Sequence, residues 1–268
     1  MQALSEFWRD PAMPYAESRR ACDSRACYKP HSHPTFSIGA VDRGRSCFSG
    51  ADDGAVTLQM GTLVFVPAGR VHACNPEPGG AWSYQMLHLD AAWLQAVRAE
   101  YAGDANHSEP IRIVAAPAVY ARFCGLNTLL FSTADAEDKE AALIEFIGEC
   151  DTGQGLRVDS GASAMPRSQA LLPVLDFLCH DAAHDTDLAD LARLAGMSRF
   201  QLIRAFRAAT GMTPHAWQLN RRINLARDGL RAGEGLADIA YRLGFADQAH
   251  FQRVFKAHAG VTPGRFRA

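Results

Sequence analysis

The stretch Leu188-Ala-Asp-Leu-Ala-Arg-Leu-Ala-Gly196 recurs later in the chain as Leu236-Ala-Asp-Ile-Ala-Tyr-Arg-Leu-Gly244. A second matching pair follows, Phe206-Arg-Ala-Ala-Thr-Gly-Met-Thr-Pro214 and Phe255-Lys-Ala-His-Ala-Gly-Val-Thr-Pro263. In each copy apolar residues recur at helical spacing, and the first helix ends at a glycine, which enters the left-handed conformation at little cost. The repeat predicts two successive units, each made of a short helix, a sharp turn and a second helix.

A short helix, a sharp turn and a second helix form the helix-turn-helix motif, whose second helix lies in the major groove of DNA. Ser198 and Asp247 are suitable N-caps for the two second helices. The outward side chains of these helices include Arg, Gln and Phe, which suit guanine, adenine and the thymine methyl group. The expected DNA-binding residues are Arg199, Phe200, Gln201, Ile203, Arg204, Gln248, Ala249, His250, Gln252 and Arg253. The alternative is a pair of helical hairpins whose polar faces are only solvated.

The segment between the two units, residues 213–231, is expected to form one helix. Pro214 falls in its first turn, a position that suits proline. The expected outward side chains are Arg221, Arg222, Arg227 and Arg231, which contact phosphate or are simply solvated. Such a helix could set the two motifs about 34 Å apart, one turn of B-DNA.

The composition is that of a core-forming protein. Of the 268 residues, 48% are hydrophobic and 21% are charged, and the net charge is −2. Residues 168–268 carry thirteen Lys and Arg against nine Asp and Glu, so the part with the repeat is basic, as is typical of nucleic-acid binding. The seven cysteines are scattered, and no apolar run reaches the about 20 residues of a membrane span. We expect a cytoplasmic protein with reduced thiols and no membrane partner.

The first half of the chain has a different periodicity. Between Thr35 and Leu89, short apolar or alternating runs are separated by turns that contain Gly or Pro, which favours a sandwich or small barrel. Helices are expected over residues 91–101, 118–131 and 135–150. Residues 151–168 are rich in Gly and Ser and predict a linker. The expected domains are residues 1–150 for effector binding, the linker 151–168, and a DNA-binding domain over residues 169–268.

The second unit carries a family signature. The segment Asp238-Ile-Ala-Tyr-Arg-Leu-Gly-Phe-Ala-Asp-Gln-Ala-His-Phe-Gln-Arg-Val-Phe-Lys256, followed by Gly260-Val-Thr-Pro-Gly-Arg-Phe-Arg267, resembles that of the AraC family of bacterial transcriptional regulators almost position by position. The resemblance implies two helix-turn-helix subdomains joined by a long helix. It also implies base or phosphate contacts at Arg199, Phe200, Gln201, Arg204, Gln248, His250, Gln252 and Arg253. Ile203 departs from the family's pattern, in which a polar residue is common.

A second resemblance lies in the first half, where five residues keep a fixed spacing: Gly61, Pro67, Gly69, His72 and Asn75. This spacing resembles the second motif of cupin barrels, and His31 and His33 stand where the first motif has its histidine pair. These histidines, with His88, could converge on a divalent metal. Because the glutamate of metal-binding cupins is missing from residues 35–39, we expect no metal and no cofactor, but a pocket for a small-molecule effector.

The candidate effector-binding residues are His31, His33, Phe36, Phe65, His72, Trp82 and Tyr84. Aromatic walls with a few polar groups suit a small ligand, although Phe36, Phe65 and Trp82 could equally be only barrel core. The implied fold class is α+β with two domains, an N-terminal cupin-like β-barrel with flanking helices and a C-terminal all-α domain with two helix-turn-helix motifs.

The resulting hypothesis is a transcriptional regulator, with activation as the family's usual mode, that binds double-stranded promoter or operator DNA and responds to a small-molecule effector. The resemblance also implies RNA polymerase and a second copy of the chain as partners. The apolar stripe on residues 142–147 is either the seam of such a homodimer or packs back on the barrel. The alternatives are a metal-dependent cupin enzyme fused to a helical domain and a DNA-binding protein without a ligand. Because the sequence shows no nucleophile–base pairing and no Gly-rich phosphate loop, we expect no catalytic residues and no enzyme.

Overall fold

The computed structural model describes residues 4–50, 55–102, 109–152, 156–158, 169–180, 183 and 186–267. The chain divides into two compact units. The first consists of Met1–Arg25, His33–Arg70 and Cys74–Ser160, and the second of Ala26–Ser32, Val71–Ala73 and Gly161–Ala268. Within the described ranges, no helix combines the length and the apolar character needed to cross a membrane.

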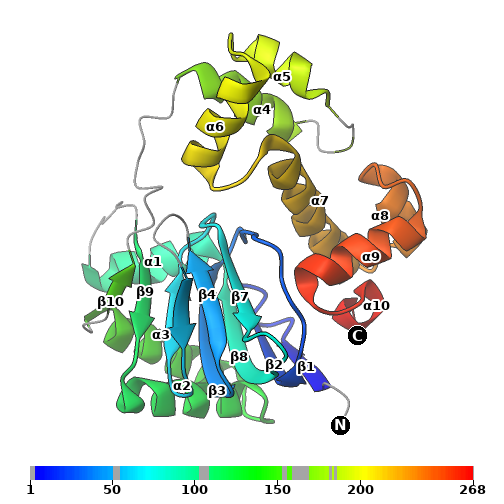
Figure 1. The fold of residues 1–268 in the computed structure, drawn as a ribbon. Coiled ribbons are helices and arrows are strands. Elements are labelled where there is room, and N and C mark those ends of the chain that lie inside the picture. Colours follow the sequence, from blue (N-terminus) through cyan, green and yellow to red (C-terminus); the bar gives the residue numbers. More distant parts are fainter. Residues whose placement is uncertain are drawn as a thin grey trace. The chain divides into compact units, whose positions relative to one another are not determined.

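The first unit is built on two antiparallel sheets, drawn in the lower half of Figure 1, although the first two residues of β7, His72 and Ala73, are assigned to the second unit. The larger sheet has the order β1-β2-β8-β3-β6-β9-β10 and the smaller one the order β5-β4-β7. The strands are β1 (Leu4–Arg9), β2 (Ala16–Ser24), β3 (Phe36–Arg43), β4 (Ser46–Gly50), β5 (Ala55–Leu58), β6 (Leu63–Val66), β7 (His72–Pro76), β8 (Trp82–Leu89), β9 (Ile111–Val114) and β10 (Leu156–Val158). The strands expected between Thr35 and Leu89 are confirmed, whereas β1, β2, β9 and β10 lie outside that range and are not expected from the sequence.

Three helices cover one face of the larger sheet: α1 (Ala91–Ala102), α2 (Pro117–Leu130) and α3 (Ala136–Thr152). They lie within two residues of the three expected helices. In the register of β3 with β8, Phe36 lies opposite Leu89 and Ile38 opposite Leu87, so these side chains share one face. All four are buried in one core with residues of the three helices.

The apolar stripe of α3 belongs to this same core. Leu143, Phe146 and Ile147 are all buried there, and Ala142 packs against them. Of the two alternatives for residues 142–147, packing back on the first unit is therefore the one that occurs, since the large apolar side chains of the stripe are buried in this core.

The second unit is helical from residue 169 onward. Its elements are η1 (Gln169–Leu171), α4 (Leu172–His180), α5 (Leu188–Leu194), α6 (Arg199–Thr210), α7 (Pro214–Arg231), α8 (Leu236–Arg242), α9 (Gln248–Ala259) and α10 (Pro263–Arg267). Figure 1 shows α7 as a long helix with the α4–α6 group at one end and the α8–α10 group at the other. The expected α+β organisation, a sheet-rich N-terminal part and an all-helical C-terminal part with two helix-turn-helix motifs, is confirmed. Most of the linker expected at residues 151–168 lies outside the described residues, but β10 falls inside that range.

Candidate functional site

The first helix-turn-helix consists of α5 and α6, and its geometry follows from local sequence. Gly196 takes a φ of +63° in the turn between the two helices. Ser198 then caps α6, because its hydroxyl accepts a hydrogen bond from the backbone N–H of Gln201. The amide oxygen of Gln201 in turn accepts from the backbone N–H of Ser198 at 2.9 Å, which completes a capping box. Leu202 and Phe206 bury the inner face of α6.

The second helix-turn-helix, α8 and α9, repeats this arrangement with different capping chemistry. Gly244 takes a φ of +70° in the turn. The carboxylate of Asp247 caps α9 by accepting from the backbone N–H of His250 at 2.6 Å. Phe251 and Phe255 are fully buried on the inner face of α9. Both second helices are thus fixed at their N-terminal ends, the end that meets base edges in this motif.

All ten expected DNA-binding residues lie on α6 or α9, and none is buried. Those that are exposed are Arg199, Phe200, Gln201, Arg204, Gln248, Ala249 and Arg253, and those that are half-buried are Ile203, His250 and Gln252. Phe200 has the guanidinium of Arg204 5.6 Å from its ring centroid. This contact holds an arginine against an apolar side chain on the outward face of α6.

Two of the ten side chains also have structural roles. The amide oxygen of Gln201 is engaged in the capping box. The imidazole Nδ1 of His250 accepts a hydrogen bond from the backbone N–H of Ala246, and its ring packs edge-on against Phe245. For base contacts these residues can offer the Gln201 amide NH2 and the second nitrogen of the His250 ring.

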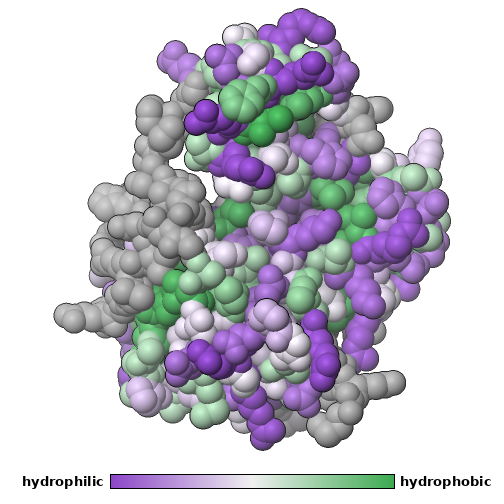
Figure 2. Space-filling model, viewed as in Figure 1, coloured by the Kyte–Doolittle hydropathy of each residue, from purple (hydrophilic) through white to green (hydrophobic). Residues whose placement is uncertain are grey.

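Figure 2 shows an apolar, green patch over the α4–α6 group, bordered by hydrophilic, purple side chains. Exposed apolar side chains of these helices include Leu172, Phe177, Leu194 and Phe200. Phe200 is the most exposed of the four, at 67%, and only Phe200 lies on α6. An apolar side chain at the start of this helix suits contact with a thymine methyl group.

The expected outward position of Arg222 on α7 is wrong. Its side chain is buried, at 4% exposure, and donates to the carbonyl oxygens of Gly244 (3.3 Å) and Ala183 (3.1 Å). Arg221 is half-buried and donates to the carbonyl oxygen of Cys179 at 2.6 Å. Arg222 therefore joins two turns of the second unit, which rules out phosphate contact for it, and Arg221 holds the C-terminal end of α4.

The larger sheet separates the candidate effector-binding residues. Phe36 and Phe65 belong to the core on the helix-covered face. Side chains along a strand alternate between its two faces, so Trp82 and Tyr84 of β8 point to the face opposite to that of Leu87 and Leu89. There the rings of Trp82 and Tyr84 stack with centroids 4.3 Å apart. The buried indole N–H of Trp82 has no hydrogen-bond acceptor among the described residues.

The histidines form two ring pairs. In the second unit, His31 and His72 exchange two backbone hydrogen bonds of 2.9 Å, and their ring centroids are 4.6 Å apart. Burial lowers the pKa of the His31 imidazole, so this ring is neutral at pH 7. In the first unit, the ring of His33 packs edge-on against His88 at 4.9 Å, and the Nδ1 of His88 is 2.9 Å from the hydroxyl of Ser37.

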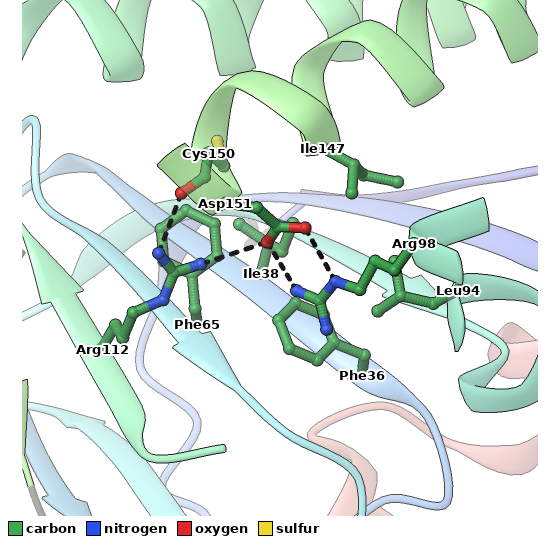
Figure 3. A pocket seen from close by; sticks show the side chains of 9 residues that line it. All are labelled: Phe36, Ile38, Phe65, Leu94, Arg98, Arg112, Ile147, Cys150 and Asp151. Carbon is green, nitrogen blue, oxygen red and sulfur yellow. Dashed lines mark hydrogen bonds and ion pairs between the residues drawn. The ribbon is translucent and has the colours of Figure 1, made fainter. Parts of the chain in front are cut away.

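A small cavity opens on the helix-covered face of the sheet, and Figure 3 shows its lining. Its apolar walls come from Phe36, Ile38, Phe65, Leu94 and Ile147, and its polar groups from Arg98, Arg112, Cys150 and Asp151. Arg98 and Arg112 reach the carboxylate of Asp151 from two sides (Figure 3). Burial raises the pKa of the Cys150 thiol to about 11, so at neutral pH it is an uncharged lining group.

Sequence reasoning reached two of the nine residues of this cavity, Phe36 and Phe65, and missed its charged groups. One signal was present, because Arg112 stands inside the apolar strand Ile111–Val114, and a charged residue in a buried strand requires a partner. Arg98 and Asp151 lie on helices without any such local sign. Only the packing of α1 and α3 on the sheet brings them together.

Two family profiles match this chain. The profile described as AraC-like ligand binding domain matches residues 14–147, and the profile described as helix-turn-helix domain matches residues 191–268. The YbfI protein of Bacillus subtilis (strain 168), named an uncharacterized HTH-type transcriptional regulator, is 25% identical over 82% of this chain and 80% of its own length. The transcriptional activator NphR of a Rhodococcus species is 37% identical, but the match covers only 35% of this chain and 28% of NphR.

The fold is shared with a solved structure. ToxT from Vibrio cholerae, in a crystal structure with an unsaturated fatty acid bound, aligns over 99% of this chain and 94% of its own, with a TM-score of 0.59 and 14% sequence identity. At that identity the likeness concerns the fold alone.

Proposed function

The chain belongs to the AraC family of transcriptional regulators, and on that basis we propose that α6 and α9 read promoter DNA under the control of a small molecule held in the first unit. The observation that carries this proposal is the matched exposure of α6 and α9. Both helices follow a left-handed glycine, both are capped at the N-terminus, and both expose an arginine one turn into the helix, Arg204 and Arg253. Two such helices in one chain can read two adjacent major-groove segments.

The roles of the side chains follow from their chemistry. Arg204 and Arg253 can each donate two hydrogen bonds to one guanine, and the side-chain amides of Gln248 and Gln252 suit adenine. Arg199, at the first position of α6, is proposed to contact phosphate. Because phosphate contacts release counterions, affinity should fall steeply with salt.

The proposal includes activation of transcription in contact with RNA polymerase, which is the family's usual mode, and action in the cytoplasm, where promoter DNA is found. Activation is supported by the similarity to NphR, which is named a transcriptional activator. A homodimer would pair through a surface other than the buried stripe of α3. No catalytic role is part of the proposal.

The test is genome-wide mapping of the DNA bound by the full chain, followed by footprinting of a bound promoter. Arg204→Ala and Arg253→Ala should each relax base preference at one position and leave the fold intact. Arg193→Ala is the matched control, because Arg193 is an exposed arginine on α5 that pairs with Asp190. Footprints that are unchanged in both variants would exclude α6 and α9 as the reading helices.

A further inference from the structure

The cavity between the sheet and helices α1 and α3 holds two guanidinium groups in apolar surroundings. Arg112 is 9% exposed and lies over the ring of Phe65 at 4.7 Å, and Arg98 lies over the ring of Phe36 at 5.1 Å. Arg112 donates to the carbonyl oxygen of Cys150 at 2.9 Å. Its buried Nε has no hydrogen-bond acceptor in the part of the chain that the structure describes. A buried arginine with an unused donor at a cavity is a place for an anion.

The carboxylate of Asp151 already occupies this place in part. Arg98 holds it with two hydrogen bonds, from Nη2 at 2.7 Å and from Nε at 2.9 Å, and the hydroxyl of Tyr101 also donates to it. The Nη2 of Arg112 is 3.8 Å from the same carboxylate, a longer contact than a hydrogen bond. Asp151 therefore accepts hydrogen bonds from two of the three nitrogens of Arg98, whereas its interaction with Arg112 is electrostatic only.

The charges around the cavity balance. Glu109 supplies the second carboxylate, at 2.9 Å from Arg98 and 3.9 Å from the Nε of Arg112. Two arginines thus face two carboxylates, and an additional anion could bind only if one carboxylate left. Of the two carboxylates, Asp151 is the easier to displace. It is the next-to-last residue of α3, and a negative charge at the C-terminal end of a helix interacts unfavourably with the helix dipole.

We propose that this cavity binds a small apolar monocarboxylate, whose carboxylate replaces that of Asp151 on Arg98 and Arg112. The inference rests on the proposed function, since it names the chemical class of the effector and its subsite. The ligand carboxylate takes up the fork of Arg98 and the unused Nε of Arg112, and the charge balance is kept as the Asp151 side chain turns out to solvent.

The apolar walls determine the size and polarity of the part of the ligand beyond its carboxylate. Phe36, Phe65 and Ile147 line a hollow that encloses only about 10 Å³, room for about one water molecule. The body of the ligand therefore enters only as the Asp151 side chain leaves and the hollow widens, and a short alkyl chain or a single aromatic ring needs the smallest widening. The neutral thiol of Cys150 adds to the apolar surroundings.

Replacement of Asp151 would couple ligand binding to the conformation at the end of α3. Asp151 ties the last turn of α3 to α1 through Arg98, and the next element along the chain is β10, which pairs with β9 before the helical unit begins. Release of Asp151 removes this tie, so the ligand shifts the population of states in which the end of α3 is free. By reciprocity, any change that frees Asp151 should favour ligand binding.

The test is calorimetric titration of the full chain, without DNA, with hexanoate and phenylacetate and with their neutral amides. Both carboxylates should bind at least about ten-fold more tightly than the amides, since a charge-assisted pair is worth more than a neutral one. Arg112→Gln should abolish this preference. Arg45→Gln, which removes an exposed arginine paired with Glu77, should retain it. Equal binding of acids and amides, or no binding of either acid at millimolar concentration, would overturn the proposal.

Asp151→Asn separates displacement from simple contact, since it keeps the shape of the side chain and removes its charge. If the ligand competes with Asp151, the variant should bind both carboxylates about ten-fold more tightly than the unchanged chain. Weaker binding would mean that Asp151 belongs to the ligand site, and displacement would be refuted. Because these titrations contain no DNA, they can fail while the footprints of Arg204→Ala and Arg253→Ala still support the proposed function, and the reverse also holds.

Discussion

Arg222, in the middle of α7, donates a hydrogen bond from Nη1 to the carbonyl oxygen of Gly244, the glycine in the turn of the second helix-turn-helix. Its Nη2 donates to the carbonyl oxygen of Ala183. The long helix between the two motifs is therefore fastened by one buried guanidinium to a turn that must keep its shape for α9 to be presented. At least one arginine of α7 therefore stabilises the fold of the second unit and is not available to contact DNA.

Arg222→Met should destabilise the protein by about 2–3 kcal/mol, because two buried carbonyl groups lose a charged donor. The measurement is urea denaturation of the full chain, followed by circular dichroism. Arg193→Met, at an exposed arginine on α5, should change the free energy of unfolding by less than about 0.5 kcal/mol. Equal losses in the two variants would contradict the assigned role of Arg222.

The two turn glycines should differ in their tolerance of alanine. Both have a positive φ, so either substitution strains the backbone by about 1 kcal/mol. At Gly196 a Cβ would meet nothing within 4 Å, but at Gly244 it would fall 1.7 Å from the carbonyl oxygen of Ala183. Gly244→Ala should therefore lower the melting temperature clearly more than Gly196→Ala in a thermal scan, and the opposite order would show that the second turn is packed differently.

Phe200→Ala should weaken promoter binding about five- to ten-fold, corresponding to about 1 kcal/mol, since an exposed apolar contact at the start of α6 is lost. The contact that holds Arg204 also disappears. Binding is measured by fluorescence anisotropy with a labelled promoter fragment. Phe177→Ala, an exposed apolar residue on α4, is the control and should bind DNA as the unchanged chain does. An unaltered affinity for Phe200→Ala would remove this residue from the interface.

Stability should fall in mild acid because of His258 on α9. Burial lowers the pKa of His258 from its ordinary value of 6.5, so the folded state binds fewer protons than the unfolded state. The stability that comes from keeping His258 neutral is fully present above pH 6.5. It is lost as the pH falls from there toward the lowered pKa, and the free energy of unfolding then decreases by at most about 1.4 kcal/mol per pH unit. The measurement is the free energy of unfolding in urea at pH values from about 7.5 to about 5, on either side of the ordinary histidine pKa of about 6.5. His258→Gln should make the loss shallower, and an identical slope in the variant would assign the acid sensitivity elsewhere.

The helical part of the fold could be predicted from sequence in detail. The periodicity of Leu188–Leu194 and Leu236–Arg242, the turn glycines and the caps Ser198 and Asp247 all appear in the structure as expected. These are interactions between residues at most a few positions apart, so the sequence contains them directly. The burial of Arg222 could not be predicted, because its partners at Gly244 and Ala183 come from turns that only packing brings to α7.

The sheet-rich part was predicted less completely for the same reason. β1 and β2 have no strong alternation, and they are strands because β8 pairs with β2 from Ala16 to Ala21 and again at Ser24, and β2 in turn pairs with β1. The candidate effector residues were chosen for their chemistry, and the sheet then placed Phe36 and Phe65 on one face and Trp82 and Tyr84 on the other.

The amino-acid sequence by itself determined the family, the division into a sheet-rich and a helical part, and the two helices that face outward with arginine, glutamine and phenylalanine. Tertiary structure alone decided that Arg98 and Asp151, 53 positions apart, share one ion pair at the edge of a cavity. Caps and helical periodicity involve residues within one or two helical turns of each other, so they can be identified from the amino-acid sequence. A charge pair in an apolar cavity depends on distances in space, which are set only when helices and strands pack together.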